Sequence, residues 1–344
     1  LSNISKPQYY CNPLFYWQAS QGKQSGVDRH SVHVNLEEIE MAGKLSTLPA
    51  GVRLGVSPLS WVNDVLEDLG AKTPLETCLA EAAQAGYEGI ELGRKFPRQA
   101  NVLSPVLKAH GLDLVSGWYS GFLAERDVAT EIVEAESHAV LLKALGCSVM
   151  VYGECGRMYA DAPLDAPLSK RLRLHPHDYA AYAERLGEFG RRLQGEHGLT
   201  LAYHHHLMMV AETFDEVSTL LDVTPSSVGL LLDTGHAYGG GFDYAKLIDR
   251  FGDRIVHIHL KDVRADVFDG VRENDRSFNE GVRGGMFTVP GDGVLDFVPL
   301  ARFVKTSGYR GWLVVEAEQD PEKAPPLAMV SKAREAIAAV FAAK

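Results

Sequence analysis

Eight short apolar runs alternate with longer amphipathic stretches from Val52 to the end of the chain. The runs cover residues 52–58, 88–93, 112–119, 148–154, 199–206, 228–236, 254–262 and 311–318. Several are continuously apolar, a pattern typical of parallel strands that are covered on both faces. The stretches between them, including 73–85, 129–145 and 177–197, carry apolar residues at helical spacing. This alternation predicts one α/β domain, a (β/α)8 TIM barrel, because eight parallel strands close such a barrel.

Two segments do not follow the alternation. Residues 1–50 show no sustained period and lack the layout of a secretory signal, so we expect a poorly structured extension outside a barrel domain of residues 51–344. Met41 would make a natural start, which predicts that residues 1–40 are an added leader or an over-extended start. The alternative is a real extension that makes oligomer contacts. Residues 265–293 are too long for a plain loop and predict a small helix and a turn beside the barrel mouth.

The composition limits the classes of binding partner and the cellular compartment that we expect. The 344 residues are 46% hydrophobic and carry a net charge of -11, which argues against nucleic acid or an anionic membrane as partner. A small polyol or keto-sugar is compatible with that charge, and a divalent cation would be attracted to it. No run reaches the roughly 18 apolar residues that would span a bilayer. The four cysteines (Cys11, Cys78, Cys147 and Cys155) lack C-x-x-C spacing. They predict reduced, buried thiols and a cytoplasmic location.

Metal-competent side chains close the last four strand runs. The histidines 204–206 end the fifth run, Asp233 ends the sixth, His259 lies in the seventh and Glu316 in the eighth. Because the C-terminal ends of barrel strands surround one mouth, we expect two imidazoles and two carboxylates to converge there. A carboxylate that follows an apolar strand would be buried without a partner unless it binds something. Mixed nitrogen and oxygen ligation suits Mn²⁺, Co²⁺, Fe²⁺ or Zn²⁺ better than Ca²⁺.

Strand alternation separates near neighbours. Successive side chains point to opposite faces, so His204 and His206 share one face and His205 takes the other. Glu316 and Glu318 share a face by the same rule, as do His257 and His259. We expect His205 and His257 to be packed or hydrogen-bonded core residues.

A second set of polar and aromatic residues is expected around this centre. Glu154 follows the fourth run and should reach the rim of the mouth. Lys261 could hold a substrate oxygen, and His236 lies in the turn after Asp233. A rim salt bridge is the alternative for Glu154 and Lys261. The first three runs end in, or are followed by, residues that could either wall the pocket or pack at the barrel top, namely Trp61, Glu91, Lys95, Trp118 and Tyr119.

Other chemistries find less support. His175 and His177 precede a helix without a third ligand, which favours capping or solvent exposure. There is no G-x-S-x-G motif and no glycine-rich phosphate loop. Cys155 stands beside Glu154, whose charge would raise the thiol pKa and weaken it as a nucleophile.

Seven segments together resemble one enzyme family. They are 55–61 (GVSPLSW), 89–97 (GIELGRKFP), 203–206 (YHHH), 232–236 (LDTGH), 257–262 (HIHLKD), 287–293 (FTVPGDG) and 311–320 (GWLVVEAEQD). In this order they resemble the myo-inosose-2 dehydratases of inositol catabolism, which belong to the xylose-isomerase-like TIM barrels. The resemblance runs from about Val52 to the C-terminus. The VPGDG and VVEAEQDP stretches are specific to the dehydratases, whereas D-T-G-H and H-x-H-L-K-D occur across the superfamily.

The resemblance implies dehydration of scyllo-inosose (2-keto-myo-inositol) to 3D-3,5/4-trihydroxycyclohexane-1,2-dione, helped by Mn²⁺ or Co²⁺, with Fe²⁺ and Zn²⁺ as alternatives. It implies a cyclic keto-polyol as substrate, and barrels of this superfamily often pair. Relatives hold the metal with Glu, Asp, His and Glu. Asp233, His259 and Glu316 match the last three ligands, while His204 replaces the first glutamate and departs from the pattern.

The chemistry of that reaction implies further roles. His206 is the best candidate for the base, because the pKa of an imidazole lies near working pH. Glu154 or Lys261 would act as the acid or hold a ring hydroxyl. The expected substrate-binding residues are His236, Trp61, Glu91, Lys95, Trp118 and Glu318. A ketose or hydroxypyruvate isomerase or epimerase stays open as an alternative. The acidic charge disfavours a DNA-repair hydrolase, and the intact ligand set disfavours an inactive sugar-binding module.

Overall fold

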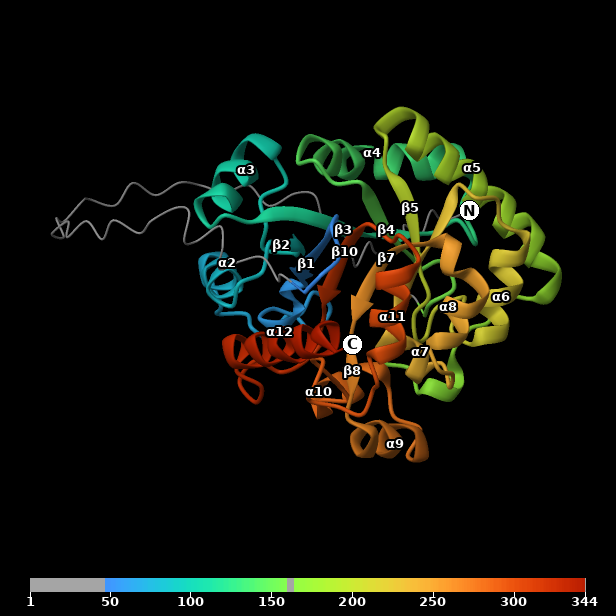
Figure 1. Ribbon diagram of the computed structural model, residues 1–344. Coiled ribbons are helices and arrows are strands. Elements are labelled where there is room, and N and C mark those ends of the chain that lie inside the picture. Colours follow the sequence, from blue (N-terminus) through green and yellow to red (C-terminus); the bar gives the residue numbers. More distant parts are fainter. Residues whose placement is uncertain (1–46, 160–163, 344) are drawn as a thin grey trace, which may run out of the picture.

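The computed structural model describes residues 47–159 and 164–343, so most of the expectation for residues 1–50 lies outside the described residues. Eight parallel strands close a barrel in the order β1-β10-β7-β6-β5-β4-β3-β2 (Figure 1). They are β1 (Val52–Val56), β2 (Gly89–Leu92), β3 (Asp113–Gly121), β4 (Val149–Glu154), β5 (Thr200–His204), β6 (Val228–Asp233), β7 (Ile255–Leu260) and β10 (Gly311–Val315). Each predicted run overlaps one of these strands, and only β3 extends past the end of its run, to Gly121. The predicted TIM barrel is therefore confirmed.

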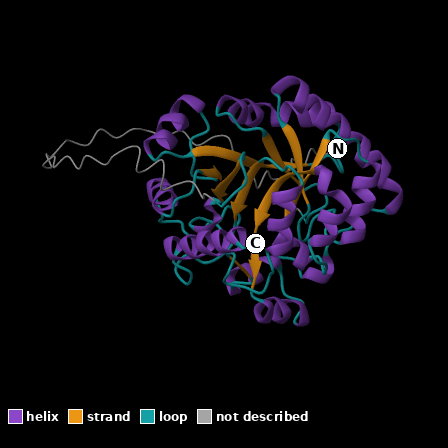
Figure 2. Ribbon diagram, in the orientation of Figure 1, coloured by secondary structure: helices purple, strands orange, loops and turns teal. Residues whose placement is uncertain are grey.

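Helices surround the barrel on its outside (Figure 2). They are α2 (Leu75–Gln84), α3 (Ala100–Ala109), α4 (Val128–Ala144), α5 (Tyr179–His197), α6 (Phe214–Val223), α7 (Thr234–Gly239), α8 (Ala245–Phe251), α11 (Val298–Thr306) and α12 (Pro326–Ala342). Short 3-10 turns are η1 (Pro58–Ser60), η2 (Leu168–Lys170), η3 (Pro176–Asp178) and η4 (Gly252–Arg254). The predicted helices 73–85, 129–145 and 177–197 are confirmed as α2, α4 and α5. His175 caps η3, where its ring accepts a hydrogen bond from the His177 N–H, as expected.

Local signals explain where several helices begin. Asp127 caps α4 by accepting a hydrogen bond from the Thr130 N–H, and Thr213 forms a capping box with Glu216 at the start of α6. Most of the hydrophobic core lies between helices and barrel, where outward-facing strand residues such as Leu230 pack. Inside the barrel a small cluster formed by Val149, Val151, Ala202 and Leu231 closes the centre.

Strand register brings the functional ends together. Asp233 at the end of β6 is paired with His259 of β7, and His204 of β5 is paired with Leu231 of β6. At the other end of the barrel a side chain on Gly89 would lie 2.7 Å from the ring of Trp312. The bulky indole therefore fills the space that this glycine leaves.

The long segment after β7 is more elaborate than expected. A small helix and a turn were predicted, whereas the structure has α9 (Ala265–Glu273) and α10 (Phe278–Gly284) between the antiparallel strands β8 (Asp262–Val263) and β9 (Phe287–Thr288). The apolar residues of this insertion form a cluster with residues that follow β1 and β5, namely Leu66, Leu69, Leu207 and Met208. The insertion therefore packs over the C-terminal end of the barrel, beside the expected site.

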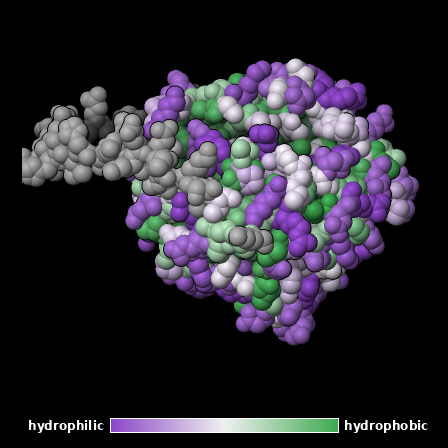
Figure 3. Space-filling view, in the orientation of Figure 1, coloured by the Kyte–Doolittle hydropathy of each residue, from purple (hydrophilic) through white to green (hydrophobic). Residues whose placement is uncertain are grey.

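The outer surface and the cysteines agree with the composition. The face shown in Figure 3 is largely hydrophilic, with scattered hydrophobic residues. Cys78, Cys147 and Cys155 are buried free thiols, as predicted, and Cys11 lies outside the described residues. Within residues 47–159 and 164–343, every helix is too short or too polar to cross a membrane.

Candidate active site

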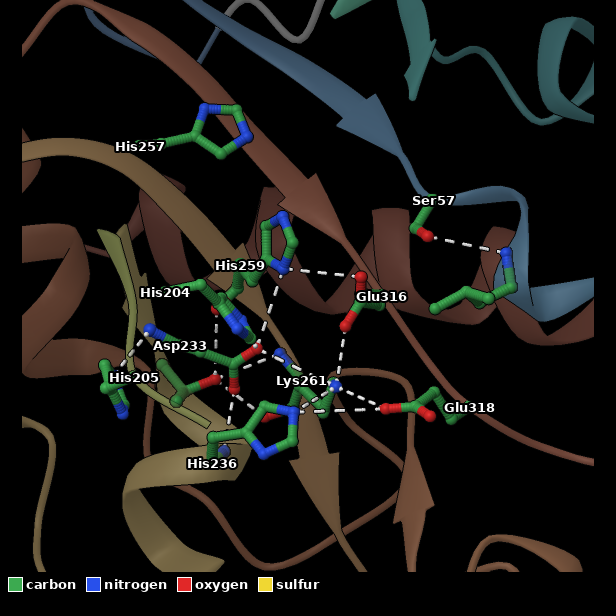
Figure 4. Close-up of polar contacts among 12 residues, drawn as sticks. Ser57, His204, His205, Asp233, His236, His257, His259, Lys261, Glu316 and Glu318 are labelled. Carbon is green, nitrogen blue, oxygen red and sulfur yellow. Dashed lines mark hydrogen bonds and ion pairs between the residues drawn. The ribbon is translucent and has the colours of Figure 1, made fainter. Parts of the chain in front are cut away.

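Four predicted ligands converge at the C-terminal end of the barrel (Figure 4). His204 Nε2 lies 3.3 Å from Asp233 Oδ2. His259 Nδ1 lies 3.6 Å from the same oxygen and 3.3 Å from Glu316 Oε2. All four side chains are buried. The structure thus brings together the two imidazoles and two carboxylates that the strand ends predicted.

The D-T-G-H turn after β6 fixes this centre. Asp233 Oδ1 accepts the His236 N–H at 2.7 Å and so caps α7, which leaves Oδ2 for the cluster. Thr234 Oγ1 donates to the Lys261 carbonyl and accepts the Lys261 N–H, so it ties β6 to the end of β7. A Cβ on Gly235 would lie 2.6 Å from Lys261 Cγ, so only glycine leaves room for the lysine stem.

The three consecutive histidines have three different environments. His204 faces the cluster. His205 points to the other face, where its Nε2 accepts the Asp233 N–H at 3.2 Å and braces the end of β6. His206 returns to the cluster side, and its Nδ1–H donates to the Leu207 carbonyl at 2.6 Å. Alternation along the strand therefore predicted the directions correctly.

His206 and His236 lie ring against ring beside the cluster, tilted by 35°. Their ring centroids are 3.7 Å apart, and His236 Nδ1 accepts the Leu207 N–H at 3.2 Å. Burial lowers the pKa of both rings well below the usual value for histidine. Trp118 lies edge-on to His204 and His206, with centroid distances of 5.5 and 5.9 Å, and walls this side as expected.

Lys261 lies among the acidic groups of the site. Its Nζ is 2.6 Å from Glu316 Oε1, 3.0 Å from Glu318 Oε1 and 2.9 Å from His236 Nε2. Burial alone would lower the pKa of Lys261, but Glu316, Glu318 and Asp233 outweigh burial and raise it. The ammonium is therefore charged. The alternative of a salt bridge at the rim does not apply, because Lys261 is fully buried.

Glu91 contacts the ligand set from inside the barrel. One of its oxygens, Oε1, lies 3.1 Å from His257 Nε2 and 3.1 Å from His259 Nε2. Glu91 was expected to bind substrate, but its hydrogen bonds place it on the far side of His259 from Glu316. His257 is a hydrogen-bonded core residue, as predicted.

Three expected site residues have structural contacts instead. The rim position expected for Glu154 is wrong, because its buried carboxylate accepts from the Tyr152 hydroxyl and from the backbone N–H groups of residues 124 and 156. This burial raises the pKa of Glu154 to about 7. The Trp61 indole donates to Glu81 of α2 at 2.6 Å, within the core between helices and barrel. The Lys95 ammonium donates to the carbonyls of the loop that precedes α2, at residues 70, 71 and 73.

Two aromatic residues of the insertion were missed in the sequence. The Phe278 ring lies 5.3 Å from His206, and the Phe287 ring lies 5.1 Å from His236 and 4.7 Å from Lys261 Nζ. A capping box formed by Ser277 and Glu280 does mark the start of α10 in the sequence. Which histidines these rings meet depends on how the insertion packs, and no local pattern carries that information.

The centre fits a divalent cation. Within the part of the chain that the structure describes, the buried Nδ1 atoms of His204 and His259 have no hydrogen-bond partner. Three buried carboxylates, Asp233, Glu316 and Glu318, lie 2.6–3.8 Å from Lys261 Nζ, and Glu91 lies beyond His259. A buried excess of negative charge is costly, and a divalent cation would reduce it while giving His259 Nδ1 a partner. The nitrogen and oxygen donors match the preferences of Mn²⁺, Co²⁺, Fe²⁺ and Zn²⁺.

Comparisons with known proteins agree with this geometry. The family model of the xylose isomerase-like TIM barrels matches residues 79–340. The rhizopine catabolism protein MocC of Rhizobium meliloti is 45% identical over 292 residues, which cover 85% of this chain and 89% of the relative. The inosose dehydratase of Bacillus thuringiensis (strain Al Hakam) is 39% identical over 288 residues, covering 83% of this chain and 96% of that protein.

Solved structures support the fold. The IolI protein with a bound zinc atom has a TM-score of 0.60 at 19% identity and covers 84% of this chain and 98% of its own. A probable 3-DHS dehydratase, AsbF from Bacillus anthracis, has the same TM-score at 13% identity. The family model and the two relatives together show the family of this chain. It is a member of the xylose isomerase-like TIM barrel family, in the group that contains MocC and the inosose dehydratases.

Proposed function

We propose that this protein is a hydro-lyase that removes water from an inosose, a cyclic keto-polyol, and forms a 1,2-dione. One observation carries the proposal: in a chain 39% identical to an inosose dehydratase, a histidine and a lysine converge on the candidate cation site. This pair can accept one proton and stabilise a leaving oxygen, which is what a dehydration needs.

The candidate ligands of a divalent cation are His204, Asp233, His259 and Glu316. When bound, such a cation would polarise the substrate ketone and make the neighbouring C–H acidic. The donor set suits several transition metals, and among them we propose Mn²⁺ or Co²⁺. The protein's own residues then have to move two protons.

His206 is positioned to take the first proton. Its Nδ1–H is held by the Leu207 carbonyl, so the lone pair at Nε2 is free to act as a base. The neighbouring His236 ring limits the orientation of His206 from one side, and Trp118 limits it from another. We propose that Nε2 accepts the proton from the carbon next to the ketone.

Lys261 is the group that would assist the leaving hydroxyl. Its ammonium already lies within 3.0 Å of two carboxylate acceptors, Glu316 and Glu318, so it can donate to a ring oxygen in the same place. The hydroxyl on the second carbon gains a proton and leaves as water. The resulting enol then becomes the second ketone, so the overall change is loss of one water. Glu154 has no part in this scheme because its contacts hold it elsewhere.

A second substrate is favoured by one comparison. MocC, which is 45% identical, is named for rhizopine catabolism. A keto-polyol from that route could use the same two proton transfers.

The test is direct. Purified protein is loaded with Mn²⁺ or Co²⁺ and incubated with 2-keto-myo-inositol, and the ultraviolet absorbance of the dione is followed with the substrate loss. We expect one dione for each inosose consumed. The proposal fails if inosose is unchanged while a ketose is isomerised. His206→Gln should lose at least about 100-fold in turnover with metal content unchanged, because general-base catalysis contributes roughly 10²–10⁴-fold. Glu81→Gln, which removes a negative charge beside Trp61 and away from the cluster, is the matched control.

A further inference from the structure

Glu91 is a buried carboxylate that the proposed reaction does not use. It lies on β2, across the barrel from β7, and touches neither Lys261 nor Asp233 by any hydrogen bond among the described residues. A buried carboxylate is costly unless its oxygens are well occupied, so the position of this one calls for an explanation.

A single oxygen of Glu91 receives three donors. His257 Nε2 and His259 Nε2 each lie 3.1 Å from Oε1, and the Ser116 hydroxyl donates to the same atom. A carboxylate oxygen only accepts, so both imidazoles must present an N–H at Nε2.

This hydrogen bond decides which nitrogen of His259 is offered to a ligand. With Nε2–H directed at Glu91, the lone pair of a neutral ring is at Nδ1. That atom has no hydrogen-bond partner in the described part of the chain and lies 3.3 Å from Glu316 Oε2 and 3.6 Å from Asp233 Oδ2. The opposite tautomer would place a lone pair against the Glu91 carboxylate and a proton where the ligand atom is needed.

We propose that Glu91 is a positioning residue that fixes the tautomer and ring orientation of His259, so that Nδ1 is the atom given to a divalent cation. His257 supports this role, because its N–H donates to the same oxygen and prevents Glu91 from turning away. A hydrogen bond from the other ring nitrogen commonly orients a metal-binding histidine. The inference rests on the proposed cation site but not on the identity of the substrate.

The competing explanation is that Glu91, His257 and His259 hold a second metal of their own. Their three ligand atoms lie within 4.8 Å of one another. Separations of 3.1 Å between ring nitrogen and oxygen match hydrogen bonds, and each N–H already has its acceptor. Metal stoichiometry separates the two explanations.

The decisive measurement uses the wild-type chain loaded with Zn²⁺. Long-range ¹H–¹⁵N spectra of ¹⁵N-histidine protein report which ring nitrogen carries the proton and which binds the metal. We expect His259 to be protonated at Nε2 and to bind zinc through Nδ1, with one zinc per chain. Zinc bound to Nε2 of His259, or two zinc ions per chain of which one is lost in Glu91→Gln, would overturn the proposal.

Variants supply the second test. Glu91→Met removes the acceptor and should weaken zinc binding about 10–100-fold in calorimetry, the usual cost of losing such a contact. Glu91→Gln keeps an oxygen for both rings and should lose clearly less. Equal losses in both variants would refute positioning by the hydrogen bond and point to charge alone. Glu131→Gln, which changes another fully buried carboxylate, should leave zinc affinity unaltered. No substrate is used, so failure of the proposed reaction does not affect the outcome.

Discussion

Asp262 offers the sharpest test of the physical reasoning about this fold. Its buried carboxylate accepts four backbone N–H groups, two on each oxygen. Val263 and Leu295 donate to Oδ1, at 2.8 and 2.9 Å, and Gly291 and Gly293 donate to Oδ2, both at 3.1 Å. The carboxylate thereby organises the VPGDG loop beside β8.

The two N–H donors on each carboxylate oxygen determine how much stability Asp262→Asn should lose. An amide has one oxygen and one NH₂ group, so either orientation sets the NH₂ group against two N–H donors. Two of the four bonds are lost. Hydrogen bonds to charged groups contribute about 1.5–3 kcal/mol each, so the free energy of unfolding should fall by roughly 3 kcal/mol or more. Asp262→Ala, which loses all four, should cost more than Asp262→Asn.

Urea unfolding followed by circular dichroism and tryptophan fluorescence measures the loss. Asp266→Asn is the matched control, because Asp266 is exposed on the neighbouring α9 and should change stability by only a few tenths of a kcal/mol. Limited proteolysis between residues 288 and 295 should accelerate in the Asp262 variants alone. If Asp262→Asn unfolds at the same urea concentration as the control, the reasoning from donor geometry is refuted.

Two further predictions concern the turn after β6 and the buried carboxyl of β4. Gly235→Ala should force the Lys261 stem aside, cost about 1–3 kcal/mol as overpacking does, and reduce turnover in the dione assay; unchanged turnover would mean that the lysine stem can move freely. Burial raises the pKa of Glu154 to about 7, so the folded protein holds this proton more tightly than the unfolded chain does. Its contribution to stability is therefore present at pH 4 and lost as the pH rises through 7. Between pH 5 and 8 the wild type should lose about 2–3 kcal/mol relative to Glu154→Gln in urea unfolding, and parallel pH profiles would contradict the shift.

The barrel could be predicted because its strands have a local signature. Runs such as 228–232 are apolar at every position, a pattern typical of strands covered on both faces, and eight short strand-like runs alternating with helical stretches leave few alternatives. The insertion was harder, since β8 and β9 have two residues each and pair only after α9 and α10 are folded between them. Such short strands carry no period that a sequence can show.

The candidate site likewise contains residues that the sequence could place and residues that it could not. The sequence by itself determined that His204, Asp233, His259 and Glu316 would meet, because parallel strands all end at one mouth and alternation sets the facing side. Whether a residue in or just after the end of a strand reaches the mouth depends on loops and on partners far along the chain. Glu154 therefore turned to Tyr152, Trp61 to Glu81, and Glu91 to the far side of His259. Only the tertiary structure decided these contacts, because hydrogen-bond partners come from elements whose packing no local pattern encodes.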